Sequence, residues 1–392
     1  MYLITQTMCA SRFTDCISPD RMQLTLIGQK NCLKHGKNKL VSLCYGIQRI
    51  PLMDLFFSTL FRYAPNKTRA GELVKFNWES KRVIHKTPII SRTIQFDDPN
   101  PRGNSHGGRG VAVIGDRVVV AGYCELQVYD TELNFLYSIT HHQMAGIHEV
   151  FHESGDRLWI VSTTLNAALL IDISTGEVLQ QIWPQEISSF QKQWNLEPGN
   201  IDKNVDNRIR FLASDVFKNK SHLHFNAIYV WQGDVYGLFN RFGAVVNLSR
   251  EKIIVEDPAI KGAHNLFIND DGIIFINDTR NQGVNLYGMN GRLIKRINLL
   301  PFHKASRIVP WYKITNPIRR VTNRAGLTKQ QVVTAFHVRG LDIHNELLFC
   351  GISPAALLCL NWKTKKFIGS YDYSDDVRIA IHGLKFAQDV NA

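Results

Sequence analysis

Residues 156–182 read DRLWIVSTTLNAALLIDISTGEVLQQI and carry the pattern that organises the chain. Leu169, Ile171 and Ile173 recur at every second position, which is the period of a half-buried β-strand. Turn-forming residues divide the stretch into three short strands. The same succession of strands and turns returns at 116–139, 234–255, 272–297 and 346–371.

One further short strand precedes each of these units, so that a complete repeat contains four strands. These first strands read RGVAVIGD, HEVFHESGD, NAIYVWQGD, HNLFINDDG and RGLDIHNE, and begin at residues 109, 148, 226, 264 and 339. Four strands at a period near forty residues are typical of a β-propeller blade. The chain is therefore predicted to be all-β.

A sixth blade is divided between the two ends of the chain. HGLKFAQ at 382–388 is a first strand with nothing after it, whereas KLVSLCYG at 39–46 and GELVKFNWESKRVIHK at 71–86 are later strands without a first strand. We predict a six-bladed propeller over 36–392 in which N- and C-terminal strands close one blade, preceded by an N-terminal extension at 1–35. Ring closure removes free sheet edges.

Three insertions interrupt the repeats, at 48–70, 183–222 and 298–336. Residues 48–66 are rich in Leu, Phe and Ile and predict a helix, either packed on the propeller or acting as a lid or membrane-surface contact. The second insertion is polar and predicts a long excursion over one face. Without the insertions and the extension, about 42 residues remain per blade, as propeller repeats require.

The third insertion concentrates positive charge, because 298–336 contains seven Lys and Arg residues and no Asp or Glu. It is either a solvated basic surface or an anion-attracting rim over the channel. The whole chain of 392 residues has a formal net charge of +12, which favours anionic partners. No nucleic-acid-binding motif accompanies this charge.

Other features exclude several classes of protein. A chain that is 44% hydrophobic and 20% charged is neither disordered nor collagen-like. No apolar run reaches the ~18 residues of a transmembrane segment, and the N-terminus lacks the pattern of a secretory signal, so a cytoplasmic location is predicted. The seven cysteines are scattered without a C-x-x-C pair and read as reduced thiols.

One equivalent position recurs in all six first strands and carries a polar side chain each time. The first strand of each blade lines the central channel of a propeller, so these six side chains are expected to converge on its axis. Desolvating them costs free energy unless they find partners. They are Arg109, His148, Asn226, His264, Arg339 and His382.

Three interpretations of this ring remain open. Arginine offers a charged, bidentate fork to sulfate, phosphate or carboxylate, and histidine can act as acid, base or nucleophile, so the ring can be an anion site. His148, His264 and His382 could instead bind Fe, Zn or Cu, although two guanidinium groups repel a cation. The third interpretation is a structural polar plug with bound water. No metal ion or other cofactor is assigned.

The third repeat adds a further candidate cluster. His224 and Asn226 point to the same side of a strand, and Arg241 on the next strand can approach them. Such a cluster can hold a tetrahedral oxyanion. The alternative is that Asn226 caps a turn and Arg241 pairs on the surface.

The repeats resemble six-bladed propellers of the gluconolactonase-like and NHL-like type, as well as uncharacterised bacterial propellers. The ring is similar to that of PAPS-independent bacterial arylsulfate sulfotransferases. HFN at 224–226 with Arg241 resembles their H-x-N…R element, GAH at 262–264 with the following DG and IND resembles their nucleophile blade, and GIH at 146–148 resembles an earlier histidine blade. That family is typically exported and carries an extra N-terminal β-domain, whereas this chain is predicted to be cytoplasmic and its N-terminal strands are predicted to complete a blade.

The resemblance implies that His264 is a sulfated nucleophile and that His148, His224, Asn226 and Arg241 stabilise the sulfuryl group. The first functional hypothesis is therefore a binder of a small anionic molecule, or a group-transfer enzyme acting on one. Its catalytic residues would be His264, His148 and His382, and its ligand-binding residues Arg109, His224, Asn226, Arg241 and Arg339.

Two other functional hypotheses stay open. The second is a metal-dependent oxygenase or lyase that uses the channel histidines as ligands. The third is a protein-interaction platform whose contact surface for a protein partner is 298–336. The sequence contains neither a P-loop nor a G-x-S-x-G nucleophile motif.

Overall fold

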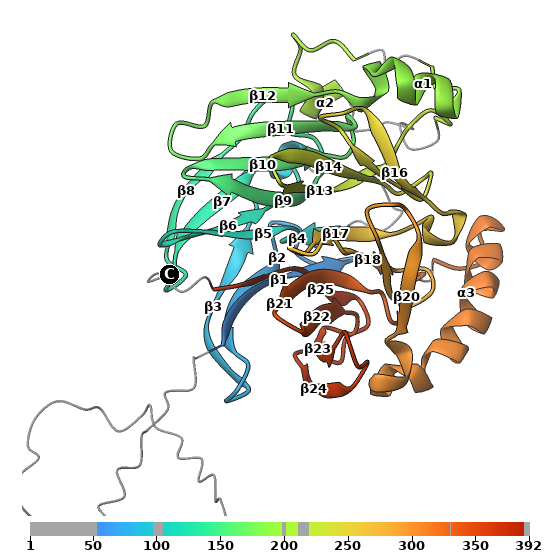
Figure 1. The fold of residues 1–392 in the computed structure, drawn as a ribbon. Coiled ribbons are helices and arrows are strands. Elements are labelled where there is room, and N and C mark those ends of the chain that lie inside the picture. The colour runs from blue at the N-terminus through green and yellow to red at the C-terminus, as the bar shows by residue number, and fades with distance from the viewer. Residues whose placement is uncertain (1–52, 97–104, 198–200, 211–218, 330, 388–392) are drawn as a thin grey trace, which may run out of the picture. The chain divides into compact units, whose positions relative to one another are not determined.

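The computed structural model describes residues 53–96, 105–197, 201–210, 219–329 and 331–387. These residues form six antiparallel sheets that radiate from a common axis, which makes the chain a six-bladed β-propeller (Figure 1). The predicted fold class is confirmed. Each blade runs outward from its first strand in the order of the chain, except the sixth, whose first strand comes from the C-terminus.

The five blades that are continuous in sequence follow the predicted repeats. The first contains β5 (Val111–Ile114), β6 (Arg117–Ala121), β7 (Leu126–Asp130) and β8 (Phe135–Ile139), and the second contains β9 (Ile147–Ser154), β10 (Arg157–Ser162), β11 (Ala167–Asp172) and β12 (Val178–Ile182). The third contains β13 (Phe225–Trp231), β14 (Asp234–Phe239), β15 (Ala244–Asn247) and β16 (Lys252–Glu256). The fourth contains β17 (His264–Ile268), β18 (Ile274–Asp278), β19 (Gly283–Tyr287) and β20 (Leu293–Asn298), and the fifth contains β21 (Arg339–His344), β22 (Leu347–Ile352), β23 (Ala356–Asn361) and β24 (Phe367–Asp372).

The sixth blade joins the two ends of the propeller, as predicted. It contains β25 (Ile379–Phe386), β1 (Asp54–Arg62), β2 (Arg69–Asn77) and β3 (Arg82–Ile90), while short β4 (Ser105–Gly107) pairs with the end of β1. The strand that pairs with β25 is β1, and the candidate strand at 39–46 lies outside the described residues, as does the extension at 1–35.

The helix predicted over 48–66 is wrong for residues 54–62, which form β1. Successive apolar residues of β1 are buried on opposite faces. Leu55 and Phe57 pack toward the fifth blade, whereas Phe56 packs toward the first. A continuous apolar run is what a strand buried on both faces requires, and its periodicity alone does not separate it from a buried helix.

The hydrophobic core is divided into six clusters, and each lies between two adjacent blades. The cluster between the fifth and sixth blades includes Phe349, Leu357 and Val74, and that between the sixth and first includes Leu73 and Val120. The first strands also contact one another around the ring, from β5 to β25 and back to β5. Closure therefore buries apolar surface at every blade boundary.

The two remaining insertions contain short helices. Residues 183–222 include the 3-10 helix η3 (Pro184–Glu186), α1 (Ser188–Trp194) and α2 (Asn207–Arg210). Phe190 and Trp194 of α1 each lie 5.8 Å from the Phe239 ring, which anchors α1 on the third blade. Residues 298–336 include η6 (Leu300–Phe302), η7 (Lys304–Arg307) and α3 (Val309–Arg324). Two further 3-10 turns are η2 (Ile94–Phe96) and η5 (Pro258–Ile260).

In the described part of the chain, no helix combines the length and apolar character needed to cross a membrane.

Candidate functional site

The first strands are irregular where they carry the ring side chains. In β17 an unpaired residue, Asn265, follows His264, and in β21 the unpaired residue is Gly340 after Arg339. Their φ angles are 52° and 62°, in the left-handed region that asparagine and glycine tolerate best. Such a β-bulge bends the strand and re-aims the neighbouring side chain. The register of β25 shifts in the same way at His382.

A cavity of about 150 Å³, large enough for several water molecules, lies among the ring residues. Four of its lining residues, Arg109, His148, Arg339 and His382, were singled out from the sequence. Two others were not predicted from the sequence, Arg62 at the end of β1 and His337 before β21. The full lining, which we call the axial cavity, consists of Leu60, Arg62, Arg109, His148, His337, Arg339, Ala380 and His382.

The axial cavity is strongly cationic. Three guanidinium groups line it, and none of its described lining residues is an Asp or Glu. Burial lowers the pKa of Arg339, and the nearby charges of Arg62 and Arg109 lower it further. Arginine nevertheless keeps its charge at neutral pH because its ordinary pKa is so high. Three like charges around one small cavity repel one another unless an anion enters.

Arg339 determines the tautomers of two imidazoles. Its Nη1 lies 3.0 Å from Nε2 of His148 and 3.0 Å from Nε2 of His382. A guanidinium can only donate, so both Nε2 atoms accept and both imidazoles carry their proton on Nδ1. In the same way, Arg62 Nη2 donates to Nδ1 of His337 at 2.9 Å.

Three donors at the axial cavity lack hydrogen-bond acceptors within the described part of the chain. They are Nδ1 of His148, Nδ1 of His382 and Nε of Arg339, and all three atoms are buried. A buried donor without an acceptor costs about 1–3 kcal/mol. Water or an anion that supplied acceptors here would remove that cost.

The three histidines predicted to be catalytic lie together. The His148 ring stacks on His264 with centroids 5.1 Å apart, and its centroid lies 4.8 Å from that of His382. His264 is not among the residues that line the axial cavity. Its Nδ1 lies 2.9 Å from Oγ1 of Thr279, whose hydroxyl donates to the Val338 carbonyl. His264 Nδ1 therefore donates, and its Nε2 keeps a lone pair.

The histidines at the axis are neutral at neutral pH. Burial lowers the pKa of His148, His264, His337 and His382 well below the usual value, and neighbouring arginine charges lower it further. Neutral imidazoles add no charge of their own. They supply N–H donors and lone pairs whose positions follow from the hydrogen bonds above.

Glu149, next to His148, does not neutralise the arginines at neutral pH. Burial raises the pKa of its carboxyl to about 8, so the protonated form predominates at pH 7. Its Oε2 accepts a hydrogen bond from Nδ2 of Asn265 at 2.5 Å. A Cβ on Gly110 would lie 2.7 Å from Oε1, which shows how closely the carboxyl fits against the first blade.

The candidate cluster in the third repeat is arranged differently. Asn226 donates to the Ala263 carbonyl at 3.0 Å, and Arg241 donates to the Asn219 carbonyl. His224 has a pKa lowered to about 4, first by burial and then by the charges of Arg339 and Arg241. None of the three predicted residues lines the axial cavity. Their role in holding an oxyanion stays a prediction.

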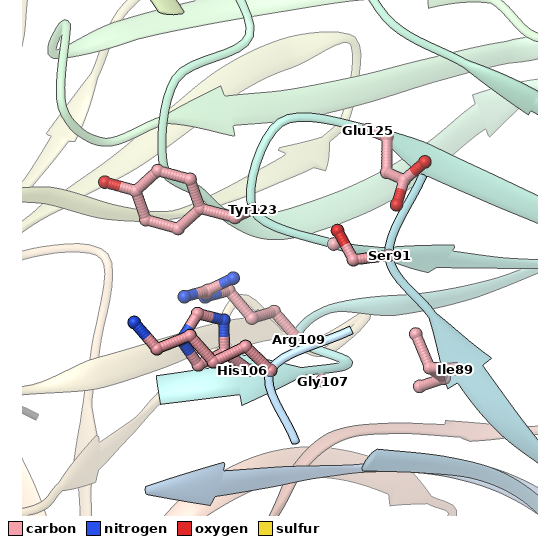
Figure 2. Close-up of a pocket in the computed structure, with 9 residues that line it drawn as sticks. Ile89, Ser91, His106, Gly107, Arg109, Tyr123 and Glu125 are labelled. Carbon is pink, nitrogen blue, oxygen red and sulfur yellow. The ribbon is translucent and has the colours of Figure 1, made fainter. Parts of the chain in front are cut away.

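Arg109 also borders a second, smaller pocket (Figure 2). Its guanidinium carbon lies 5.0 Å from the centre of the Tyr123 ring. His106 and Glu125 contribute other polar groups to the lining. The pocket holds about 10 Å³, roughly the space of one water molecule, so a ligand larger than water does not fit there.

A larger groove of about 460 Å³ runs between α3 and the fourth and fifth blades. It shares His337 with the axial cavity and contains four cationic side chains, Lys261, Arg280, Lys313 and Arg320. No Asp or Glu is among its described lining residues. Such a charged groove raises the local concentration of anions next to the axial cavity.

The histidines do not fit a metal site. The Nε2 lone pairs of His148 and His382 both accept from Arg339, whose positive charge repels a cation. Within the described ranges, no group of three or more His, Cys, Asp or Glu side chains is placed to hold a metal ion. The metal-dependent alternative therefore lacks a donor set in this arrangement.

Comparisons with known proteins found resemblances to solved structures at low sequence identity. No protein-family model matches it, and no curated protein matches it in sequence. A solved protein of unknown function from Bacteroides caccae has a TM-score of 0.49 at 11% identity and covers 85% of this chain and 100% of its own. A chain of the nidogen/laminin complex has a TM-score of 0.49 at 9% identity, covering 85% and 98%. The β-propeller domain of Cps50 (Swd1) from Myceliophteria thermophila has a TM-score of 0.43 at 9% identity, covering 83% and 95%.

Proposed function

We propose that the protein binds a small oxyanion, of the sulfate, phosphate or carboxylate class, in the axial cavity. The observation that carries this proposal is the coincidence of three guanidinium groups with three buried donors that lack acceptors, around one cavity without a lining carboxylate. An oxyanion supplies both the negative charge and the acceptors. Hydrogen bonds between charged partners are shorter and stronger than neutral ones.

Each lining group has a distinct part in this proposal. Arg62, Arg109 and Arg339 supply charge, and His148 and His382 supply Nδ1–H donors. Because Arg339 already donates to both imidazoles, it positions them as well as contributing charge. Water molecules in the cavity would accept hydrogen bonds from these donors but would leave the three cations without a counter-charge.

Thermal unfolding tests the proposal directly. We expect sulfate or phosphate to raise the melting temperature saturably relative to chloride at matched ionic strength, and the Arg339→Gln variant to lose this response. Arg292→Gln, which removes an exposed arginine of the fourth blade, is the matched control and should respond like the wild type. Equal anion responses in the wild type and Arg339→Gln would exclude binding in the axial cavity.

A second candidate function is transfer of a sulfuryl or related group through His264. Its support is the neutral imidazole whose Nε2 lone pair is left available by the Thr279 hydrogen bond, 5.1 Å by ring centroids from the cavity residue His148. With an aryl sulfate, Nε2 would form an N–S bond while the S–O bond to the aryl group breaks and the phenolate leaves with its electron pair. An acceptor hydroxyl would then attack the sulfur, so that an O–S bond forms, the N–S bond breaks and its electron pair returns to Nε2, and the hydroxyl proton passes to the phenolate or to water.

Intact-mass analysis tests this second candidate. A covalent sulfuryl adduct after mixing with an aryl sulfate, lost in His264→Ala but retained in Arg292→Gln, would support it. An adduct that persists in His264→Ala would exclude His264 as the nucleophile. Anion binding without an adduct or phenol release would show that the protein binds the anion without transferring a group.

A further inference from the structure

The helix α3 presents an unusual surface to solvent. The side chains of Trp311, Ile314, Ile318 and Val321 are 63%, 64%, 58% and 66% exposed. Their spacing of three, four and three residues places them in one stripe along one face of the helix. Leu327, just beyond the helix, is 76% exposed. Contiguous apolar surface of this kind marks an interaction site more often than isolated exposed residues do.

The stripe is not the face by which α3 packs on the propeller. Val309 is buried in the cluster between the fourth and fifth blades, and Tyr312 packs against that cluster. Asn316 donates from Nδ2 to the Val333 carbonyl at 2.8 Å. At about 3.6 residues per turn these positions lie opposite the stripe. In Figure 1, α3 lies alongside the blades rather than between them.

Positive charge borders the stripe on both sides. By the same helical geometry, Arg319 lies on one side of it, where it also donates to the Gln331 carbonyl, and Arg324 lies on the other. The surrounding sequence intensifies this charge, because 279–341 contains twelve Lys and Arg residues and no Asp or Glu. A partner for this face must therefore combine an apolar layer with negative charge on both flanks.

We propose that α3 docks the protein on a bilayer surface that contains anionic phospholipid. The apolar stripe would enter the boundary between headgroups and acyl chains, and the flanking cations would meet lipid phosphates. Trp311 suits such a boundary because tryptophan combines a large apolar ring with one polar N–H. The helix has 16 residues, fewer than the ~20 of a spanning helix, so it lies in the surface. This inference does not depend on the axial anion site.

Vesicle co-sedimentation with the full chain tests the proposal. We expect binding to vesicles of phosphatidylcholine mixed with phosphatidylglycerol, weakening at high salt, and little binding to phosphatidylcholine alone. The double variant Ile314→Ser/Ile318→Ser should weaken binding at least about tenfold. Arg319→Gln/Arg324→Gln should weaken it specifically for the anionic vesicles.

A matched control uses two exposed isoleucines elsewhere, in Ile209→Ser/Ile294→Ser, whose side chains are 57% and 54% exposed in the native protein. This variant should bind vesicles like the wild type. All variants must keep the wild-type melting temperature and anion response, which separates failure of docking from failure of the axial site.

Depth of insertion gives a second readout. Brominated acyl chains in the anionic vesicles should quench a component of tryptophan fluorescence that disappears in Trp311→Phe. The proposal is overturned if the wild-type chain does not sediment with anionic vesicles, or if the Ile314→Ser/Ile318→Ser variant sediments equally well. It is also overturned if light scattering shows that the chain forms a dimer through the stripe and if anionic vesicles do not dissociate that dimer.

Discussion

Arg339 donates a 3.0 Å hydrogen bond from Nη1 to Nε2 of His148, a residue 191 positions earlier in the chain. The two residues belong to the fifth and second blades, which face each other across the ring. A single guanidinium therefore ties opposite sides of the propeller together at its axis. The same bond fixes the proton of His148 on Nδ1, where no described residue accepts it.

Arg62 should contribute to anion binding although its position is outside the repeat pattern. Arg62→Gln removes one of three cavity charges and the donor to His337, so we expect the dissociation constant for sulfate to rise roughly tenfold. Isothermal titration calorimetry measures this change. Arg69→Gln, at the exposed first position of β2, is the control and should bind sulfate normally.

Anion affinity should fall as the pH rises through about 8. Below that value Glu149 is protonated, whereas above it the carboxylate supplies negative charge beside Arg339 and competes with a bound anion. His148 and His382 are already neutral throughout this range, so their protonation does not change the anion affinity with pH there. Sulfate binding measured from pH 6.5 to 9 should weaken in the wild type and stay flat in Glu149→Gln. An identical decline in both proteins would contradict this assignment.

Acid should destabilise the fold through the axial histidines. Their folded pKa values are lowered, so below pH 6.5 the unfolded chain binds protons that the folded chain cannot. Each of the four histidines should therefore lower the free energy of unfolding by about 1 kcal/mol between pH 7.5 and 5.5. Glu149, whose pKa is raised to about 8, acts in the opposite sense over this range and offsets part of their sum. Urea unfolding at the two pH values measures the decrease, and His382→Gln should reduce it. A decrease of unchanged size in that variant would argue against His382 as a contributor.

Gly383 should be intolerant of a side chain, because it lies where the closing strand meets the first blade. A Cβ there would lie 2.0 Å from the Arg109 carbonyl oxygen and 2.8 Å from Oγ of Ser58. We expect Gly383→Ala to lower the free energy of unfolding by about 2 kcal/mol or more, since backbone must move to relieve the contact. Gly369→Ala, in outer strand β24 with its nearest neighbour at 3.7 Å, is the control and should change stability little.

Repeats with strong local signals could be predicted from the sequence. The unit at 156–182 and its counterparts contain alternating apolar residues and turn residues close together in the chain, so each blade is specified by nearby positions. Equivalence among repeats then placed His148, His264, Arg339 and His382 at one axis, where their contacts confirm that they meet. Their catalytic and ligand-binding roles stay predictions.

Residues outside the repeats could not be placed in this way. The run containing Leu55, Phe56 and Phe57 was predicted as a helix, because periodicity alone does not separate a buried helix from a buried strand, and Arg62 at its end was therefore not placed in the ring. His337 precedes Arg339 by two residues, and that alternation was the signal that could have brought it into the ring. His337 fell outside the prediction, which rested on one equivalent position per repeat.

The sequence by itself determined the strand repeats, the number of blades and the side chains that each first strand carries toward the axis, because these depend on spacing along the chain. Tertiary structure decided which of them share a cavity, which nitrogen of each imidazole is protonated, and that Glu149 holds its proton to about pH 8. Those properties arise from groups brought together by ring closure and from the loss of water around them, neither of which is encoded in local periodicity.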